Sequence, residues 1–243
     1  MERILLPTFL VLFSIFQAEA QSDAEVQGRD LAQQVLDTVA QRPAGNVTNT
    51  GILEIRGDNG RTRVPLSFKV VLTPTNWQHI YEADPPAGAE KLTVTYHPGQ
   101  PPTAAYESPG HAIVTSSMLD NLSLRNQPFA GSDFSIGDLD LSFLTWPSQK
   151  VLKKDIHRSR GCIILISTNP HPSVNDYSRV QSWVDTETLG IVEAYAYDAD
   201  GKEMKDFYPK NFKKVNGQYQ VETLIMENEL TGSRSRLDFD WNK

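Results

Sequence analysis

The stretch YSRVQSWVDTETLGIVEAYAYDADGKEMK, residues Tyr177 to Lys205, predicts two β-strands, a tight turn and the start of a third strand. Arg179 to Asp185 alternates in part between apolar and polar residues, and Ile191 to Tyr197 is rich in β-branched and aromatic residues, which is typical of strands. Asp198-Ala199-Asp200-Gly201 predicts a hairpin turn, because glycine tolerates positive φ and aspartate hydrogen-bonds to its own backbone. This stretch therefore indicates an antiparallel sheet.

The same pattern recurs on both sides of that stretch. Upstream, we predict strands at Ile52–Arg56, Val64–Thr73, Trp77–Glu82, Leu92–Tyr96, Lys150–His157 and Gly161–Thr168, and downstream at Glu203–Lys214, Tyr219–Glu229 and Ser233–Trp241. Asp58-Asn59-Gly60 is a strong hairpin signal between the first two. The total is about ten or eleven strands, and a sheet of that size must curl or split into two.

Two regions depart from the strand pattern and predict helices. Ser22-x-x-Glu25 is a capping-box pattern, and the helix it opens carries Leu31, Val35, Leu36 and Val39 on one side before Arg42-Pro43 ends it. Between His111 and Trp146 the alternation is lost, and two short helical pieces are expected at Ser116–Asn121 and Asp138–Thr145. Helices with one apolar side are expected to cover one face of the sheet.

The order of several residues along the chain carries a family resemblance. In the opening stretch they are Tyr177, Arg179, Val180, Trp183, Asp185, Tyr197, Asp200-Gly201-Lys202 and Lys205. GSDFSIGDL from Gly131 to Leu139, which contains Asp133 and Phe134, precedes them, and Met226-x-Asn228-x-x-Thr231-Gly232 with Leu237 and Phe239 follows them. In this order the C-terminal half resembles the bacterial outer-membrane lipoprotein-sorting proteins, the LolA-like family.

The resemblance implies a fold and a mode of binding. The fold class is mainly β with a few helices (α+β), a half-open antiparallel β-barrel of about ten strands covered by helices, as in LolA- and LppX-like proteins. In that family the concave face holds acyl chains of lipoproteins or other lipids. The resemblance also implies an inner-membrane donor and an outer-membrane acceptor as partners.

The amino terminus predicts export. Residues 1–20 combine Arg3, an apolar run from Ile4 to Phe16 and the small-x-small pattern Ala18-Glu19-Ala20, which is typical of a cleaved secretory signal peptide. A run of about 13 residues is too short to span a bilayer, which needs about 20. Residue 21 is Gln, so the lipidated cysteine of a mature lipoprotein is missing. We therefore expect a soluble periplasmic protein with one domain, residues 21–243.

Composition narrows the function classes. Of the 243 residues 39% are hydrophobic and 22% are charged. The net charge is −7 and the sequence has no long run of Lys and Arg, which argues against nucleic-acid binding. Cys162 is the single cysteine, so an intramolecular disulfide is excluded, and its apolar surroundings indicate a buried thiol.

No residue pattern indicates catalysis or a cofactor. The five histidines, His79, His97, His111, His157 and His171, lack the spacing of zinc or iron ligands and are expected on the surface or in loops. Asp198-x-Asp200-Gly201 lacks the outer ligands of a calcium loop. The pairs Asp138 with Asp140 and Asp238 with Asp240 are expected on solvated faces. We therefore expect no enzyme activity, no cofactor and no metal.

The candidate site is an apolar cleft. Its predicted lining is Leu66, Phe68, Val70, Leu72, Leu92, Val94 and Tyr96, with Leu139, Phe143 and Trp146 beneath a covering segment. Alternatively, other strand faces line it, as at Cys162 to Ile166, or these residues form a filled core that binds no lipid. The family-motif residues are Asp133, Phe134, Tyr177, Arg179, Trp183, Asp185, Gly201, Lys202 and Lys205. Trp183 is expected to pack in the sheet, and Arg179 and Asp185 are expected to form ion pairs or cap turns. The alternative is a contact with the covering segment or with a lipid head group.

The sequence predicts a periplasmic carrier that binds acyl chains and delivers them towards the outer membrane. The alternative is a binding module that senses lipid or lipoprotein in the cell envelope without transporting it.

Overall fold

A single antiparallel sheet dominates the structure, a computed structural model that describes residues 8–41, 45–58, 60–98, 100–110, 114–115, 125–174, 176–215 and 218–241. Side chains are described from residue 22 on, except at residues 114, 115 and 218. Its first seven strands in chain order are β1 (Val47–Gly57), β2 (Gly60–Leu72), β3 (Trp77–Ala83), β4 (Glu90–Tyr96), β5 (Thr103–Glu107), β6 (Val114–Thr115) and β7 (Ser148–His157). The others are β8 (Arg160–Thr168), β9 (Arg179–Asp185), β10 (Ile191–Tyr197), β11 (Glu203–Val215), β12 (Gln218–Asn228) and β13 (Ser233–Asp240).

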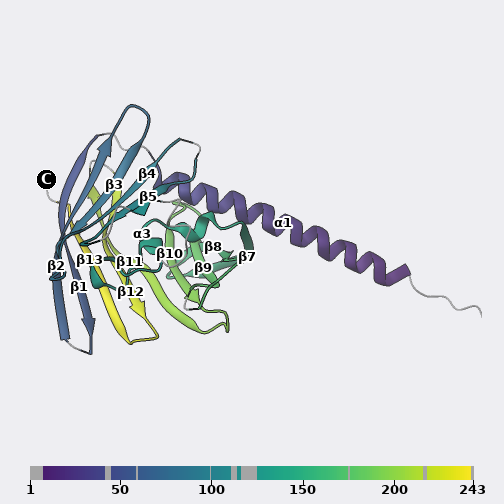
Figure 1. The fold of residues 1–243 in the computed structure, drawn as a ribbon. Helices are drawn as coiled ribbons and strands as arrows, with labels where there is room; N and C mark the ends of the chain where they lie inside the picture. The colour runs from purple at the N-terminus through teal and green to yellow at the C-terminus, as the bar shows by residue number, and fades with distance from the viewer. Residues whose placement is uncertain are drawn as a thin grey trace, which may run out of the picture.

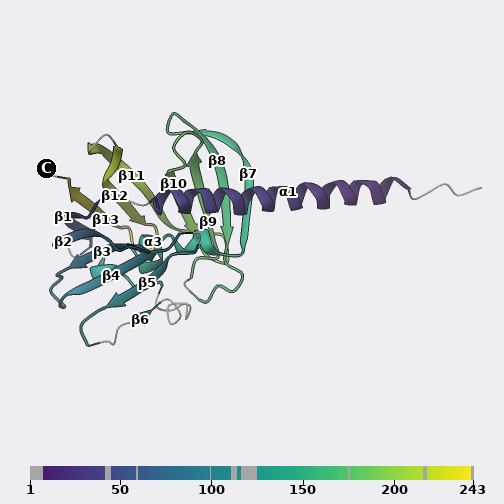
Figure 2. The same cartoon turned by 90° about the horizontal axis from the view of Figure 1, so that it is seen from above.

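The strands form two antiparallel meanders that are joined where β1 pairs with β13, and β6 and β7 are the two free edges of the sheet. Their order is β6-β5-β4-β3-β2-β1-β13-β12-β11-β10-β9-β8-β7, so the first and last strands of the chain are neighbours. Leu53 in β1 lies opposite Leu237 in β13, which joins the two halves of the chain. The sheet curls between its two free edges, as Figures 1 and 2 show. The predicted half-open antiparallel barrel is confirmed.

Helices lie on the concave side of the sheet. The long helix α1 (Thr8–Val39) packs with its second half against β7 and β8, while its first half projects away from the sheet (Figures 1 and 2). Between β6 and β7 lie the short helices η1 (Phe129–Gly131), α3 (Ile136–Leu139) and η2 (Ser142–Thr145). We call residues 125–147 the central segment.

Alternating side chains explain why these strands form. In β2, Val64, Leu66, Phe68 and Val70 are buried, and the residues between them are more exposed. A strand places successive side chains on opposite faces, so this pattern turns the apolar side of β2 towards the helices. The Asp198–Gly201 turn forms as predicted, with Gly201 at a φ of 80°.

Three expectations about the elements were wrong in detail. The described residues contain thirteen strands, because Thr103–Glu107 and Val114–Thr115 also pair into the sheet. The first helix begins at Thr8, so Ser22 lies inside it and does not cap its start. Asp138–Thr145 is not one helix, since Leu141 has a φ of 55° between α3 and η2. The helix expected at Ser116–Asn121 lies outside the described residues.

Candidate functional site

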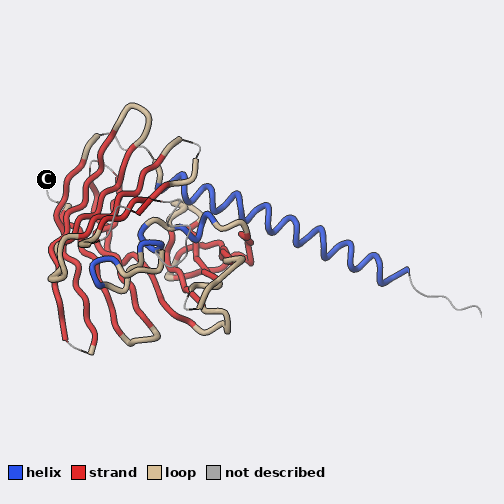
Figure 3. The backbone as a smooth tube through the Cα atoms, in the orientation of Figure 1, coloured by secondary structure: helices blue, strands red, loops and turns tan. Residues whose placement is uncertain are grey.

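Two apolar clusters cover the concave face of the sheet. The first, the barrel cluster, joins β1 to β5, β12 and β13 to the central segment through Phe129, Phe134 and Ile136, each of which is at most 1% exposed. The second, the helix cluster, joins Leu31, Val35 and Leu36 of α1 to η2 and to strands β8–β10. The central segment therefore fills the hollow of the sheet, where Figure 3 shows its short helices inside the curve of the strands.

The predicted cleft residues lie in these two clusters. Those buried in the barrel cluster are Leu66, Phe68, Val70, Leu92, Val94, Tyr96 and Leu139. Leu72 is half-buried against the same cluster, whereas Phe143 is buried in the helix cluster and Trp146 packs beside it. The fold thus brings the ten residues to one face of the sheet, and their contact with lipid stays a prediction.

Aromatic rings gather at one end of the barrel cluster. The Phe68 ring lies 5.5 Å from His79, 5.4 Å from Phe239 and 6.1 Å from Trp241, measured between centroids. His79 was expected on the surface or in a loop, and that expectation was wrong, because it lies in β3 among these rings. Burial lowers the pKa of its imidazole to about 4, so the side chain is neutral near pH 7 and fits an apolar surface.

Small cavities lie where the central segment meets the strands. One of about 10 Å³ is lined by Asp138, Tyr177, Lys205 and apolar neighbours, and another of about 20 Å³ lies beside Arg125 and Trp146. Each has room for about one water molecule. An acyl chain that entered at these places would therefore have to displace side chains of the central segment.

Asp133 ties the central segment to the strands at the barrel cluster. Its carboxylate accepts hydrogen bonds from Asn228 Nδ2 at 3.1 Å, from Ser235 Oγ at 2.7 Å and from Ser233 Oγ. Its backbone carbonyl accepts a hydrogen bond from Lys205 Nζ at 2.7 Å. These four bonds connect one residue of the central segment to β11, β12 and β13.

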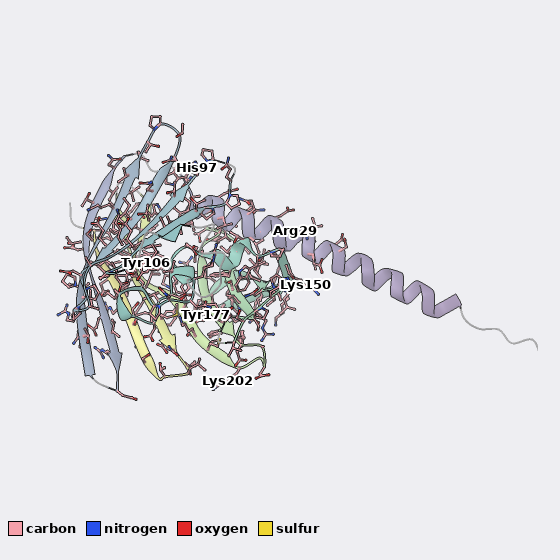
Figure 4. All side chains as sticks on the ribbon, viewed as in Figure 1. Arg29, His97, Tyr106, Lys150, Tyr177 and Lys202 are labelled. Carbon is pink, nitrogen blue, oxygen red and sulfur yellow. The ribbon has the colours of Figure 1, made fainter. Side chains whose placement is uncertain are left out.

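A buried polar cluster forms the second tie. Lys205 Nζ lies 3.3 Å from Asp138 Oδ2, and the Tyr177 hydroxyl donates to Asp138 Oδ1 at 3.1 Å. Ser135 Oγ accepts from the Asp138 backbone N–H and the Ser135 backbone N–H donates to Asp138 Oδ2 at 2.8 Å, which makes a capping box at the start of α3. Ser135 Oγ also donates to Asp138 Oδ2 at 2.7 Å. Tyr177 is labelled beside the central segment in Figure 4. We call Asp133, Asp138, Tyr177 and Lys205 the latch.

Charges within the latch shift the pKa of two members. Burial by itself lowers the pKa of the Lys205 ammonium, but the Asp138 carboxylate and its hydrogen bonds outweigh burial and raise it above its usual value. Burial, reinforced by the same carboxylate, raises the pKa of the Tyr177 hydroxyl well above its usual range. Both groups therefore keep their protons at neutral pH, so Lys205 is the one cation of the latch and is paired with the Asp138 carboxylate.

The expectation of solvated acids at Asp138 and Asp140 was wrong. Their exposed fractions are 7% and 6%, since α3 turns both residues away from water. Asp140 lies 3.6 Å from Arg125 and accepts from the backbone N–H of Ser142. Burial nonetheless raises the pKa of the Asp140 carboxyl to about 6. The spacing Ser135-x-x-Asp138 was the sequence signal for this cap.

The family-motif residues divide into two groups. Asp133, Phe134, Tyr177 and Lys205 come together at the central segment, although they are far apart in sequence. Gly201 and Lys202 lie in the β10–β11 turn, where the Lys202 backbone N–H donates to Asp198 Oδ1 at 2.8 Å. The motif thus includes three of the four latch residues and also positions that shape the sheet.

The remaining motif residues stabilise β9. The Arg179 guanidinium lies 4.2 Å from the centre of the Tyr197 ring. Trp183 lies on the convex face, stacked on His157 with centroids 4.5 Å apart, and Asp185 pairs with Arg160 and accepts from the backbone N–H groups of the turn that follows β9. In this arrangement Trp183 packs on the sheet and Asp185 pairs with a cation and caps a turn, whereas Arg179 lies over an aromatic ring. Cys162 is buried on the same convex side, as predicted.

Within the described chain, no helix has the combined length and hydropathy of a membrane span. The described side chains include no cluster of three His, Cys, Asp or Glu that could hold a metal ion.

Comparisons with known proteins agree with this architecture. A family model with the description "-like: Uncharacterized protein" matches residues 120–241, which is 122 of the 243 residues. No curated protein is similar enough in sequence to be reported as a relative.

Solved structures share the fold over nearly the whole chain. A DUF1329 family protein from Desulfovibrio piger has a TM-score of 0.67 at 18% identity and covers 90% of this chain and 92% of its own. A Vibrio parahaemolyticus domain whose name assigns it to outer membrane lipoprotein sorting has a TM-score of 0.68 at 17% identity, with 89% and 91% covered. For a LolA superfamily protein from Nitrosomonas europaea the values are 0.54 and 18%, with 86% and 91% covered.

Proposed function

Since the chain has the LolA-like fold and belongs to the family whose model matches residues 120–241, we propose that it is a periplasmic carrier for acyl chains of lipoproteins or other lipids. The observation that carries this proposal is the filling of the concave face. Its apolar side chains are covered by the central segment and by α1, neither of which is a strand of the sheet. Lys205 ties the central segment to β11 through Asp133 and Asp138.

The free energy of burial makes such binding feasible. At about 0.8 kcal/mol per buried methylene, an acyl chain of about 16 carbons supplies roughly 12 kcal/mol of gross transfer free energy. The costs of association and of displacing the central segment reduce this value. A carrier needs that reduction, because cargo must pass to an acceptor that binds it more tightly.

The proposed carrier takes its cargo from an inner-membrane donor and delivers it to an outer-membrane acceptor. Arg3, the apolar run and Ala18-Glu19-Ala20 support export, since they match a cleavable signal peptide. The names of the similar lipoprotein-sorting and LolA superfamily structures support the cargo class.

Mass spectrometry of the protein from residue 21 on, purified from its native periplasm without detergent, tests the cargo. Stoichiometric acylated protein supports the carrier of lipoproteins, and free phospholipid supports lipid transport. An empty protein that also takes up no fluorescent fatty acid contradicts the proposal. Acylated protein that binds but never passes to membranes in a transfer assay favours the sensing module instead.

Substitutions then locate the binding face. Phe68→Glu and the milder Phe68→Ser place a polar group within the barrel cluster, so fatty-acid uptake should fall at least tenfold. The matched control is Thr93→Glu, because Thr93 is flanked in β4 by the buried Leu92 and Val94 and faces the opposite side. Circular dichroism and thermal unfolding establish that each variant is folded. Unchanged uptake by folded Phe68 variants rules out this face.

A further inference from the structure

The hairpin of β11 and β12 runs beyond the rest of the sheet. β10 pairs with β11 only as far as Phe207, and β13 pairs with β12 only from Thr223 on. β11 and β12 remain paired with each other out to Val215 and Gln218. Residues 208–215 and 218–222 therefore form a two-stranded extension, which we call the ribbon and which belongs to the yellow-green hairpin in Figure 2.

The ribbon is basic on an acidic protein. The ribbon contains Lys210, Lys213 and Lys214 and one acidic residue, Glu222. The chain as a whole has a net charge of −7, so without these three lysines it carries −10. Lys210 and Lys214 are exposed. The ribbon is thus a positively charged element on a protein of negative net charge.

Aromatic side chains accompany the lysines. Phe212 is 50% exposed and Tyr219 is 74% exposed. Lys214 lies directly opposite Tyr219 in the pairing, and its Nζ is 5.8 Å from the centre of the tyrosine ring. Phe212 precedes Lys214 by two residues, so it shares that face of the ribbon. Exposed aromatics beside lysines are the combination that binds the interface of a bilayer.

The ribbon is anchored at the aromatic end of the barrel cluster. Trp241 Nε1 donates a hydrogen bond to the carbonyl oxygen of Val221 at 2.7 Å. The same indole packs against Phe68 and Phe239, with centroids 6.1 and 5.9 Å apart. A surface that binds through the ribbon therefore lies next to one end of the concave apolar face.

We propose that the ribbon docks the protein on an anionic phospholipid bilayer. Lys214 faces the headgroups on the same side as Phe212 and Tyr219, which enter the interface between headgroups and acyl chains, and Lys210 and Lys213 add positive charge to the ribbon beside them. Charge complementarity favours an anionic surface, and the exposed rings favour a bilayer over a soluble anion. The inference goes beyond the carrier role and does not depend on it.

Sedimentation with vesicles tests the role of charge. The full chain from residue 21 should bind vesicles made of equal parts of phosphatidylglycerol and phosphatidylcholine, and this binding should weaken with added salt. Binding to vesicles of pure phosphatidylcholine should be poor. Each lysine near an anionic surface strengthens binding about fivefold, so K210Q/K213Q/K214Q should bind on the order of 100-fold more weakly. The control K153Q/K154Q/K202Q makes the same charge change at exposed sites outside the ribbon and should bind as the unchanged protein does.

A second pair of variants tests the aromatic contribution. F212S/Y219S should weaken vesicle binding at least tenfold while binding to soluble heparin stays the same, whereas I156S/V174S, at even more exposed sites elsewhere, should alter neither. Equal losses in either control set, or equal binding to both vesicle types, would overturn the proposal. So would unchanged vesicle binding by F212S/Y219S, which would reduce the ribbon to a simple anion-binding strip. Fatty-acid uptake is measured on the same variants, because it reports on the carrier role and vesicle sedimentation reports on membrane docking, so a failure of one is distinguished from a failure of the other.

Discussion

Lys205 and Asp138 form an ion pair that is almost entirely removed from water, with side chains 16% and 8% exposed. Two buried charges lose hydration, and their attraction compensates only when both are present and well hydrogen-bonded. Asp138 also accepts hydrogen bonds from Ser135 and Tyr177. Lys205 therefore compensates the negative charge of the Asp138 carboxylate, and the other two residues fix its orientation. The pair therefore orients the central segment more than it adds net stability.

Removing only the cation should accordingly be costly. We expect Lys205→Met to lower the free energy of unfolding by about 3–5 kcal/mol, because it leaves Asp138 as an unpaired buried carboxylate. Lys202→Met serves as the control, since Lys202 is exposed in the β10–β11 turn, and should change stability by less than about 0.5 kcal/mol. Urea unfolding measures both. Equal stabilities of the two variants would show that the pair does not hold the central segment.

Asp140 predicts a pH dependence of stability. Its pKa is raised to about 6, so between about pH 4 and pH 6 the folded state holds a proton that the unfolded state has released. Stability from this group therefore rises as the pH falls through 6, by an amount on the order of 3 kcal/mol. Asp140→Asn, which cannot titrate, should remove that rise.

Urea unfolding at several pH values checks this prediction. Asp206 on the convex side also has a raised pKa, about 7, chiefly through burial, so the unchanged protein contains a contribution of the same sign. The difference between it and Asp140→Asn isolates Asp140. Exposed Asp84→Asn provides the control and should leave the slope as it is. A parallel slope in Asp140→Asn would contradict the prediction.

At the scale of elements, α1 depends on a close approach to the sheet. A Cβ added at Gly28 would lie 2.5 Å from backbone atoms of Gln149 and Lys150 in β7. Gly28→Ala gains about 1 kcal/mol of helix propensity, but the overlap costs about 1–3 kcal/mol or displaces α1. We therefore expect a net loss of stability and faster hydrogen exchange in α1, against the sign that propensity predicts.

Gln27→Ala is the matched control for this prediction. Gln27 is the neighbouring residue and is exposed, so the substitution changes propensity without approaching β7. Its stability should be equal or slightly higher. Hydrogen exchange of residues 22–39 distinguishes the cases, and slower exchange in Gly28→Ala than in the unchanged protein would mean that α1 does not pack as closely as described.

Elements were predictable where their signal was local. The alternation of apolar and polar residues identified β2. The predicted strands Arg179–Asp185 and Ile191–Tyr197 have the same bounds as β9 and β10 in the structure. Thr103–Glu107 was missed, because it follows two prolines and contains two alanines, which have little β-propensity. It forms a strand because β4 offers an unpaired edge, and a partner strand is not visible in five residues of sequence.

For the whole molecule, the candidate site was predictable in its apolar part only. The faces of β2 and β4 follow from periodicity, so seven lining residues could be named from it. The latch could not, because Lys205 meets Asp138 across 67 positions of sequence. From sequence alone, an acidic residue is predicted to be exposed to solvent. Asp138 is buried because the tertiary fold brings a cation and a tyrosine beside it from distant parts of the chain.

The latch and the cargo compete for one concave face, which gives the last prediction. Cargo must displace the central segment, so the apparent affinity for lipid is reduced by the cost of opening. Tyr177→Phe removes one hydrogen bond to a buried carboxylate, worth about 1.5 kcal/mol, so fatty acid should bind up to about tenfold more tightly and leave more slowly. Tyr208→Phe also loses a carboxylate hydrogen bond, to Glu227, but on the convex face, and should bind lipid as before. Fluorescent fatty-acid titration with stopped-flow release measures both. Equal affinities in the two variants would separate the latch from cargo binding, whereas tighter binding in Tyr177→Phe alone would identify the closed central segment as the element that sets carrier affinity.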